Sequence, residues 1–403
     1  MKNEKGSGRR LLIIGAGWEQ VPLLQRARDY GCTIVAAATD PQAEGLSLAD
    51  IVEIADPRDL PRLVEIAERH GVDAVTADEC DYSNYAAMVI RRVKGWRSGP
   101  ISAVQFTTNK HWMRQRCKQA HIVQPRFAAC RSMDEVKAAV ELIDFPVIVK
   151  PVDNRGSFGV RRVDSDAELE PAFLHALMNA HSREVLVEAY IDGIHLTVDG
   201  CVDSNGIHHN LGIASKEVAT GDKPIITEVV YPAEISADLC SLVLDTNSKV
   251  IHSLGISRGI THSEYILDDR GRCFLLETAN RGGGVMTSTL ILPAITGVDI
   301  PDVLIREALD MPFAIQPLSE PRAALLGFLV FRPGRIASIT GVDDVRSFPG
   351  VLHLRMLVKP GDALVSPQSG AGRHGFGIFV GNSVAEVREL HRRVVDCIEV
   401  VYA

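Results

Sequence analysis

Paired cysteines are what this sequence most clearly lacks. None of its eight cysteines stands in a CxxC arrangement, which is the spacing typical of zinc sites and redox pairs. In a chain of 403 residues, scattered cysteines are expected to be reduced and packed, not joined in a disulfide framework. The sequence therefore predicts neither a zinc site nor a disulfide-stabilised secreted domain.

A long apolar run and an excess of positive charge are also missing. The polar start MKNEKGSGRR is followed by LLII, which is too short for a signal peptide or a membrane span. The net charge is -8, which argues against non-specific binding to nucleic acid. We therefore expect a cytoplasmic protein that needs neither nucleic acid nor a membrane as a partner.

What the sequence does contain is, first, a regular alternation of strands and helices. Its length predicts two or three domains. In the first hundred residues, apolar runs at 11–17, 32–40 and 72–78 alternate with helical patterns that begin near Glu19 and at residue 59. This order predicts a parallel, doubly wound sheet, which binds ligands beyond the carboxyl ends of its strands.

The turn GAGWEQ raises a dinucleotide-binding alternative, an oxidoreductase with Asp40 as the acid that holds the ribose. The third glycine of the GxGxxG pattern is Gln20 here, so close packing of helix on strand is not ensured. The pattern favours an ordinary tight turn in a Rossmann-like domain.

From Thr107 onward, strands and helices occur in a mixed order that predicts an α+β domain. Antiparallel strands are expected at 197–202 and 207–218, a long helix at 236–255, and a hairpin at 261–281 that turns at DDRG. After about Pro317, short strands and Gly/Pro turns lead to a terminal helix at 383–398.

The stretch FLLETANRGGG, in the second strand of that hairpin, carries the clearest chemical signal. Antiparallel pairing brings Glu264 and Glu277 onto one face, where two carboxylates need a cation such as Mg²⁺ between them. Asn280 adds a neutral oxygen, and Arg281 is a planar donor for phosphate or carboxylate. The glycines after Arg281 allow a close backbone approach. The alternative is a pair of exposed strand acids beside a loose loop.

A second signal is Lys150, which closes the apolar strand FPVIVKP just before a Gly/Ser loop at 154–159. An ammonium group and backbone N–H groups of such a loop suit phosphate oxygens. The spacing differs from a Walker A loop. Taken alone, the same pattern also fits a surface lysine whose stem lies along apolar side chains.

In combination, these segments resemble the ATP-grasp superfamily. Lys110, VKP with its glycine loop, VEAYIDG, the strand glutamate and E-x-x-N-R-GGG follow in the order typical of that superfamily over about residues 107–300. The resemblance implies a Rossmann-like pre-ATP-grasp domain at 1–106, an ATP-grasp domain at 107–316 with a lid subdomain at about 120–188, and a small α+β domain at 317–403. The fold class is thus mixed α/β and α+β.

The resemblance also implies an ATP site. Lys110 and Lys150 are expected at the α- and β-phosphates, and Glu188 and Ile191 beside the adenine, the latter through its backbone. His195 stands where many members have a glutamate that binds the ribose. The lid loop is expected to be Arg155, Gly156, Ser157, Phe158 and Gly159.

For the metal, the resemblance implies that Glu264 and Glu277 bind Mg²⁺, with Mn²⁺ as an accepted substitute. Many members have an asparagine two residues after the second glutamate, where this chain has Ala279. Asn280 is the expected replacement. Arg281 is expected to steady the transferred phosphoryl group, which makes Arg281, Glu277 and Lys150 the candidate catalytic residues.

The segment from 333 to about 387 resembles the closing domain of ligases that join L-amino acids, and the segment 76–88 resembles a substrate loop of the same group. The implied activity is an ATP-dependent carboxylate–amine ligase that forms an amide or peptide bond through an acyl phosphate. Glu228, Tyr231, Arg281 and Gly283 are the candidate substrate residues. His374, in GRHGFG, either reaches the site or lies in a turn.

Two further expectations follow. The alternative enzyme is a bicarbonate-activating ATP-grasp carboxylase of the purine-biosynthesis type. A homodimer of the chain, with small-molecule carboxylate and amine substrates, is expected by analogy with relatives.

Overall fold

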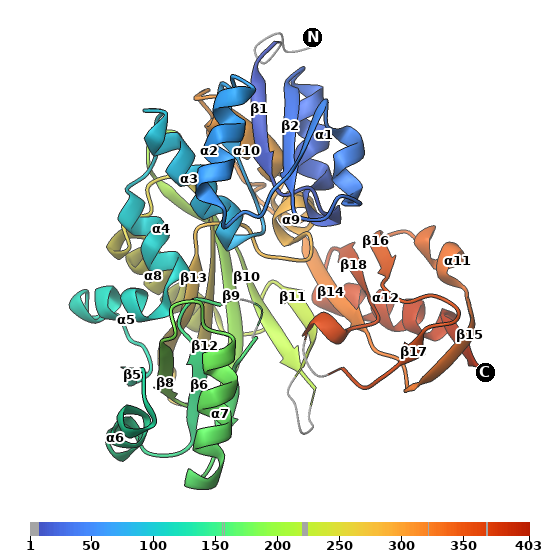
Figure 1. Cartoon of the computed structure of the whole chain (residues 1–403). Coiled ribbons are helices and arrows are strands. Elements are labelled where there is room, and N and C mark those ends of the chain that lie inside the picture. Colours follow the sequence, from blue (N-terminus) through green and yellow to red (C-terminus); the bar gives the residue numbers. More distant parts are fainter. Residues whose placement is uncertain (1–7, 155, 157, 220–224, 321, 368–369) are drawn as a thin grey trace.

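The computed structural model describes residues 8–154, 156, 158–219, 225–320, 322–367 and 370–403. Within these residues the strands form sheets of four, eight, three and four strands. Figure 1 shows the N-terminal elements above a central sheet, a smaller sheet with the expected lid strands below it and the C-terminal elements to one side. The mixed α/β and α+β fold class expected from the sequence is confirmed.

The N-terminal domain is the parallel sheet that the alternating pattern predicts. Its strands lie in the order β3-β2-β1-β4 and are parallel. They are β1 (Arg10–Ile14), β2 (Thr33–Ala38), β3 (Ile51–Ile54) and β4 (Ala74–Thr76). The accompanying helices are α1 (Val21–Asp29), α2 (Leu60–Arg69) and α3 (Asp81–Val93). Helix α2 illustrates the local rules, because Asp59 caps its first turn and Leu63, Ile66 and Ala67 bury one face.

The segment expected to form the lid, for which the name lid is kept, is a smaller antiparallel sheet with the order β5-β8-β6-β7. Helices α4 (Ile101–Thr108) and α5 (Lys110–Gln119) lead into it. Its elements are β5 (Phe127–Cys130), α6 (Met133–Ile143), β6 (Val147–Pro151), β7 (Arg161–Val163), α7 (Asp166–Met178) and β8 (Val185–Ala189). Helices α6 and α7 pack on the apolar core of this sheet. The buried polar residues of β6 and β8, Lys150 and Glu188, lie one residue from the ends of their strands.

The central sheet has eight strands in the order β13-β12-β9-β10-β11-β14-β18-β16. The first five are β9 (Ile194–Val202), β10 (His208–Val218), β11 (Ile226–Tyr231), β12 (Gly259–Leu267) and β13 (Cys273–Ala279). The expected long helix is α8 (Ala237–Ser253), and it covers one face over β10 and β13. The antiparallel strands and the hairpin expected from the sequence are confirmed.

The last segment of the chain completes this same sheet. Strands β14 (Ala323–Leu329), β16 (Val351–Met356) and β18 (Gly375–Gly381) join it beside β11. The remaining elements are β15 (Gly334–Thr340), α11 (Val342–Arg346), β17 (Ala363–Leu364), α12 (Val384–Cys397) and β19 (Glu399–Tyr402). The expected terminal helix is confirmed as α12, whereas β19, which follows it, was not expected. Strand β14, which follows residue 317, pairs with β11, which precedes it, so one sheet spans the expected domain boundary. The domain limits therefore stay a prediction.

The opposite face of the central sheet holds the N-terminal domain in place. A single apolar core joins Ile13 and Leu23 of that domain to Tyr231 of β11 and Phe376 of β18. Between them lie the π-helix η4 (Thr287–Ile291), α9 (Leu292–Thr296) and α10 (Ile300–Ala308). The carboxyl ends of β1 and β4 therefore meet the segment after β13, where the sequence places its glycines.

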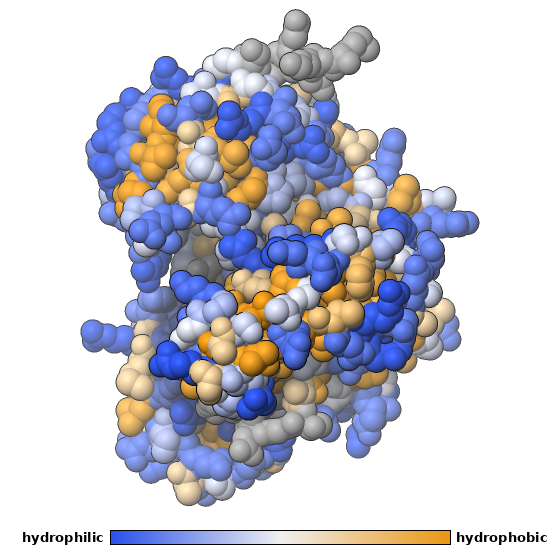
Figure 2. Space-filling model, turned by 90° about the vertical axis from the view of Figure 1, so that its right-hand side faces the viewer, coloured by the Kyte–Doolittle hydropathy of each residue, from blue (hydrophilic) through white to orange (hydrophobic). Residues whose placement is uncertain are grey.

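The surface is mixed in character. On the face shown in Figure 2, polar side chains surround apolar areas on the upper part and along the middle. In the described part of the chain, no single helix is long and apolar enough to cross a membrane, and one bent helix pair, Thr287–Thr296 with Ile300–Ala308, passes that test only when taken together.

Candidate active site

The two glutamates of the hairpin lie side by side, as expected. Glu264 on β12 and Glu277 on β13 are direct cross-strand partners. Lys216 of β10 lies 2.7 Å from Glu264, and Lys110, the first residue of α5, lies 2.8 Å from Glu277. Adjacent carboxylates repel unless cations offset their charge, and here each has its own lysine. Sequence reasoning missed Lys216. It stands two residues after Ala214 in a predicted strand, so the two side chains share one face of that strand.

The electrostatics keep the first of these carboxylates ionised. Burial by itself would raise the pKa of the Glu264 carboxyl, but Lys216 and His262 lower it well below its usual value. A carboxyl that stays ionised is a suitable ligand for a hard cation.

Lys150 belongs to a buried cluster next to the glutamate pair. Its Nζ lies 2.6 Å from one oxygen of Glu188, and Arg114 Nε donates to the other oxygen at 2.5 Å. Burial raises the pKa of Glu188, but Arg114 and Lys150 outweigh it and bring this pKa to about 2. Burial lowers the pKa of Lys150. Both oxygens of Glu188 are therefore engaged in holding cations, and Arg114 is a residue that sequence reasoning missed.

The lid loop is only partly described. Arg155 and Ser157 lie outside the described residues, whereas Gly156 and Phe158 are placed, and the Phe158 side chain is 49% exposed. Gly159 has φ +80°, and a Cβ there would stand 2.8 Å from Cβ of Asn179. Only glycine fits this position without displacement. The loop connects β6, the strand that carries Lys150, to β7.

The residues expected beside the nucleoside lie at the junction of the lid and the central sheet. Ile191 is half-buried just after β8. His195 on β9 pairs in register with Lys216 and Ile266. Burial, with the nearby Lys216, lowers the pKa of His195, so its imidazole is neutral at physiological pH. This placement makes His195 a neighbour of the lysine and glutamate pairs.

Arg281 is positioned by the N-terminal domain. Its Nε donates to Asp81 Oδ1 of α3 at 3.1 Å, and its Nη1 donates to the carbonyl of Gly282 at 2.7 Å. Burial would lower the pKa of Arg281, but Asp81, together with the charges of Glu277 and Glu264, raises it. Arg281 is therefore a permanent cation whose charge is felt at the two glutamates, and Asp81 is a partner that sequence reasoning missed.

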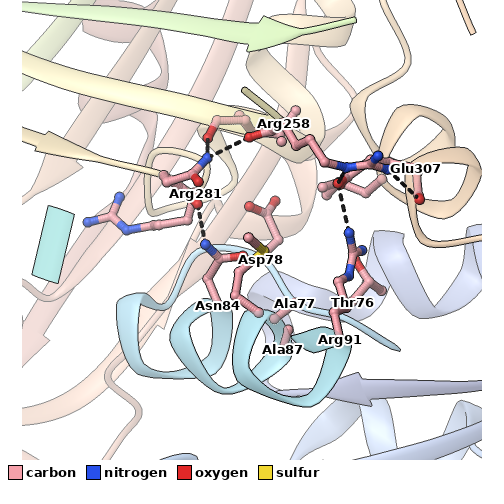
Figure 3. A pocket seen from close by; sticks show the side chains of 14 residues that line it. Thr76, Ala77, Asp78, Asn84, Ala87, Arg91, Arg258, Arg281 and Glu307 are labelled. Carbon is pink, nitrogen blue, oxygen red and sulfur yellow. Dashed lines mark hydrogen bonds and ion pairs between the residues drawn. The ribbon is translucent and has the colours of Figure 1, made fainter. Parts of the chain in front are cut away.

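Asn280, the expected third metal ligand, is engaged elsewhere. Its side-chain Nδ2 donates to the backbone carbonyls of Arg258 at 3.0 Å and Ile260 at 2.9 Å. Its backbone carbonyl accepts from Asn84 Nδ2. It lines a small pocket between α3 and β12, which Figure 3 shows together with Arg258 and Asn84. The structure thus brings Glu264 and Glu277 together but turns the Asn280 amide toward the backbone at the start of β12.

The glycine loop after Arg281 rests on two carboxylates that follow β4. Asp78 accepts from the Gly282 N–H at 2.8 Å and from Ser288 Oγ at 2.7 Å. Glu79 accepts from Ser288 Oγ at 3.1 Å and from the Met286 N–H at 3.3 Å. Burial raises the pKa of both carboxyls, and in Glu79 the charges of Glu19 and Asp78 add to the effect. These neutral donors hold the loop in place without a cation.

The two candidate substrate residues of β11 do not lie together. Glu228 faces α12, where His391 lies at 3.0 Å and Arg388 at 3.5 Å. Tyr231 is buried, and its hydroxyl donates to Asp199 Oδ2 at 2.6 Å. Residues three apart on a strand point to opposite faces, which explains the separation.

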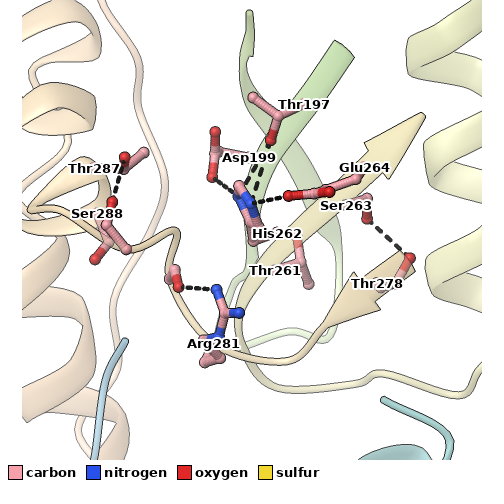
Figure 4. Close-up of polar contacts among 12 residues, drawn as sticks. Thr197, Asp199, Thr261, His262, Ser263, Glu264, Thr278, Arg281, Thr287 and Ser288 are labelled. Carbon is pink, nitrogen blue, oxygen red and sulfur yellow. Dashed lines mark hydrogen bonds and ion pairs between the residues drawn. The ribbon is translucent and has the colours of Figure 1, made fainter. Parts of the chain in front are cut away.

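His262 lies between Asp199 and Glu264 (Figure 4), beside Gly283 of the glycine loop. Its Nδ1 lies 2.7 Å from Asp199 Oδ1, and its Nε2 lies 3.7 Å from Glu264. Burial would lower the pKa of His262, but Asp199 and Glu264 raise it. A Cβ at Gly283 would approach His262 Nδ1 to 2.9 Å, so this glycine makes room for the ring.

Two other expectations concern turns. His374 is buried, its Nδ1 accepts from the Phe331 N–H at 2.9 Å, and its Nε2 lies 3.3 Å from the Val365 carbonyl. It therefore fixes a turn of the C-terminal segment. In the GAG turn, Gln20 Oε1 accepts from the Gly17 N–H at 2.9 Å, so the glutamine side chain folds over the turn.

The donor set fits a magnesium–phosphate ligand. Among the described residues, no three His, Cys, Asp or Glu side chains form a metal cage of their own. Mg²⁺ typically binds through one or two carboxylates and completes its coordination with phosphate oxygens and water. Two adjacent glutamates, surrounded by Lys110, Lys150 and Arg281, satisfy that description.

Comparison with known proteins gives the same picture. Residues 143–289 match the model of an ATP-grasp domain, and residues 327–403 match L-amino acid ligase C-terminal domain 2. The formate-dependent phosphoribosylglycinamide formyltransferase of Burkholderia pseudomallei is 27% identical, over 98% of this chain and 96% of its own.

Solved structures agree in fold. The crystal structure of an L-amino acid ligase from Bacillus licheniformis has a TM-score of 0.83 at 20% identity and covers 98% of this chain and 99% of its own. The biotin carboxylase domain of the Hydrogenobacter thermophilus 2-oxoglutarate carboxylase, solved with MgADP, ADP and bicarbonate, has a TM-score of 0.74 at 16% identity, over 98% of this chain and 90% of its own. The chain therefore contains an ATP-grasp domain and, after it, an L-amino acid ligase C-terminal domain.

Proposed function

We propose that this protein is an ATP-dependent carboxylate–amine ligase that takes an amino acid as a substrate and forms an amide or peptide bond. The observation that carries the proposal is the paired Glu264 and Glu277 with their lysines, in a chain that ends in a C-terminal domain of the L-amino acid ligase type. Its partners are then small molecules, and homodimerisation stays an expectation.

ATP and Mg²⁺ are the proposed ligands of the site. Glu264 and Glu277 would hold the metal, without Asn280, and Mn²⁺ is expected to substitute for it. When bound, the metal neutralises charge on the phosphate oxygens. Lys110 would exchange its bond to Glu277 for a phosphate, and Lys150, already aligned by Glu188, would contact another. Ile191 and His195 would lie beside the nucleoside.

The reaction then proceeds by positioning and charge stabilisation. A carboxylate oxygen of the acid forms a bond to the γ-phosphorus, and the bond to the β-phosphate oxygen breaks, which releases ADP. Arg281, fixed by Asp81, offsets the negative charge that develops on the transferred group. The amine nitrogen next bonds to the acyl carbon, phosphate leaves, and the amine gives up its proton. The lid loop would keep water away from the acyl phosphate.

The test is ADP release by the purified protein with Mg²⁺, ATP and single or paired amino acids, followed by mass spectrometry of each mixture. The proposal expects ADP that depends on the amino acid and a product whose mass equals the pair minus water. The matched control is Glu277→Gln, which should give neither. ADP that depends on bicarbonate alone would support the carboxylase alternative instead.

A further inference from the structure

Arg373, in the turn that precedes β18, is a cation without an anion. In the part of the chain that the structure describes, it forms no ion pair, and its Nε is buried without a hydrogen-bond partner. Burial lowers the pKa of Arg373 to about 10, and no nearby carboxylate offsets this effect. The guanidinium stays charged at physiological pH, so an anion that binds to it would recover part of the free energy lost on burial.

The guanidinium is held against an aromatic ring. Its central carbon lies 3.6 Å from the centroid of the Phe328 ring on β14, which is the contact distance of a cation–π pair. One face of the group is thus covered, while its N–H donors lie around the edge, where a carboxylate can accept two of them. A Cβ at Gly370 would stand 3.0 Å from Nη1 of Arg373, so this glycine leaves room for the group.

Phe328 lies on the same face of the central sheet as the glutamate pair. Its ring packs against the apolar core that includes Ile260 of β12. Glu264 stands four residues after Ile260 on that strand, so the two side chains point to the same side of the sheet. Arg373 therefore lies over the face of the sheet that carries the proposed metal ligands.

A row of contacts continues from Phe328 to the glycine loop. Phe376 of β18 is the direct cross-strand partner of Phe328, and its ring centroid lies 5.2 Å from that of Trp18. Glu19, next to Trp18, accepts from the Val285 N–H at 2.8 Å. Because Val285 directly follows the three glycines, this row joins the surroundings of Arg373 to the loop after Arg281.

The reaction itself indicates which anion remains for Arg373. In the proposed mechanism, Lys110, Lys150 and Arg281 meet the phosphate groups, and the reacting carboxylate of the acid becomes the amide. An amino acid that supplies the amine keeps its α-carboxylate through both steps. In a site that excludes water, this carboxylate needs a cation of its own.

We propose that Arg373 binds the α-carboxylate of the amino acid that supplies the amine, and that it makes the enzyme select amino acids over amines without this charge. The inference rests on the proposed function and adds to it a binding residue for the second substrate.

The primary test compares one amine with and without its carboxylate. The amino acid that serves as the amine in the paired ligation assay is measured against its α-carboxamide, which keeps the amine and carries no negative charge. The kcat/KM for each is determined in the wild type, in Arg373→Gln and in Arg373→Lys.

We expect the wild type to prefer the amino acid by about tenfold or more, because a hydrogen-bonded charge is lost in the carboxamide. In Arg373→Gln, the kcat/KM for the amino acid should fall by about tenfold or more, and that for the carboxamide should change less than about twofold. Arg373→Lys keeps the charge without the paired donors and should lie between the two.

Arg332→Gln is the matched control. Arg332 belongs to the same C-terminal segment, and its guanidinium also lies 3.6 Å from the centroid of an aromatic ring, that of Tyr402, but it is exposed. This variant should keep the wild-type kcat/KM for both amines.

A second readout separates substrate binding from a structural function. Hydroxylamine traps the activated acid and has no carboxylate, so ADP formed with it should not depend on Arg373. We expect Arg373→Gln to keep both the kcat of this reaction and the KM for the acid within about twofold of the wild type. A residue that only supports the fold, or that binds the acid, would change them.

The outcomes are distinguishable. A wild type that ligates the amino acid and its carboxamide equally well, or a preference that survives in Arg373→Gln, would overturn the inference and leave the proposed function intact. A higher KM for the acid in the hydroxylamine reaction of Arg373→Gln would also overturn it. A wild type that forms no amide with any pair of amino acids would overturn the proposed function and the inference together.

Discussion

Two sets of carboxylates border the site, and they are stabilised in opposite ways. Glu188 and Glu264 face Arg114, Lys150 and Lys216, and the cations lower the pKa of both carboxyls. Asp78 and Glu79, in contrast, face hydroxyl and backbone N–H donors, and burial raises the pKa of both.

The difference distinguishes carboxylates that we propose take part in ligand binding from carboxylates that hold the structure together. Charged pairs can exchange one partner for a ligand, as Lys110 would exchange Glu277 for a phosphate. The acids after β4 instead hold the loop at Gly282 and Met286 through neutral donors, which suits a fixed joint between domains. The variants below test whether the two sets behave as differently as their surroundings predict.

The largest effect is expected for Glu188→Gln. The substitution leaves Arg114 and Lys150 buried without an anion, and breaking a buried ion pair from one side costs about 3–5 kcal/mol of the free energy of unfolding. Urea unfolding measures the loss. The matched control is Glu217→Gln, an exposed glutamate, which should change the free energy by less than about 0.5 kcal/mol. A similar small change for Glu188→Gln would contradict the description of the first set.

The low pKa of Glu188 also predicts that the free energy of unfolding falls in acid. Its pKa is about 2 in the folded protein, whereas an unperturbed glutamate has a pKa of 4.5, so the folded state binds fewer protons. This stabilisation is complete above pH 4.5 and is lost as the pH falls toward 2. Unfolding measured against pH should therefore show a smaller acid loss in Glu188→Gln than in the wild type.

Glu277→Gln should abolish most activity with little effect on folding. The amide keeps the shape of the side chain but removes a metal-binding charge, and we expect ADP formation to fall about a hundredfold or more. Glu217→Gln again serves as the control, because it neighbours Lys216 but is exposed. Full activity of Glu277→Gln would remove the metal assignment.

The smallest effect is expected for Glu79→Gln, in the second set. Because the pKa of Glu79 is raised, the folded state binds more protons than the unfolded chain, and the wild type loses stability as pH rises above the unfolded value of about 4.5. Glutamine does not titrate, so the variant should differ from the wild type by less than about 1 kcal/mol at low pH and gain relative to it as pH rises. A constant difference across this range would show that Glu79 stays ionised.

Sequence reasoning predicted that Glu264 and Glu277 lie side by side, but it missed Lys216 and Arg114, the cations beside Glu264 and Glu188. Glu264 and Glu277 were predictable because strand pairing is local and the hairpin turn fixes the register. Lys150 was predictable because it ends an apolar strand before a glycine loop. These are short-range patterns.

Long-range partners were the part that the sequence could not predict. Asp81 contacts Arg281 from 200 positions away, and Asp199 holds His262 across two strands whose pairing the sequence alone did not specify. Glu228 and Tyr231 were grouped by proximity in sequence, although strand alternation already placed them on opposite faces. Asn280 was assigned by spacing, and only the tertiary structure shows its amide turned toward Arg258 and Ile260.

The most direct measurement of the central claim follows one oxygen atom. The acid substrate is labelled with heavy oxygen in its carboxylate, and the inorganic phosphate released during ligation is analysed by mass spectrometry. A ligase that works through an acyl phosphate transfers one labelled oxygen from the acid to phosphate for each amide bond formed, and we predict that result. Amide formation with unlabelled phosphate would contradict the account.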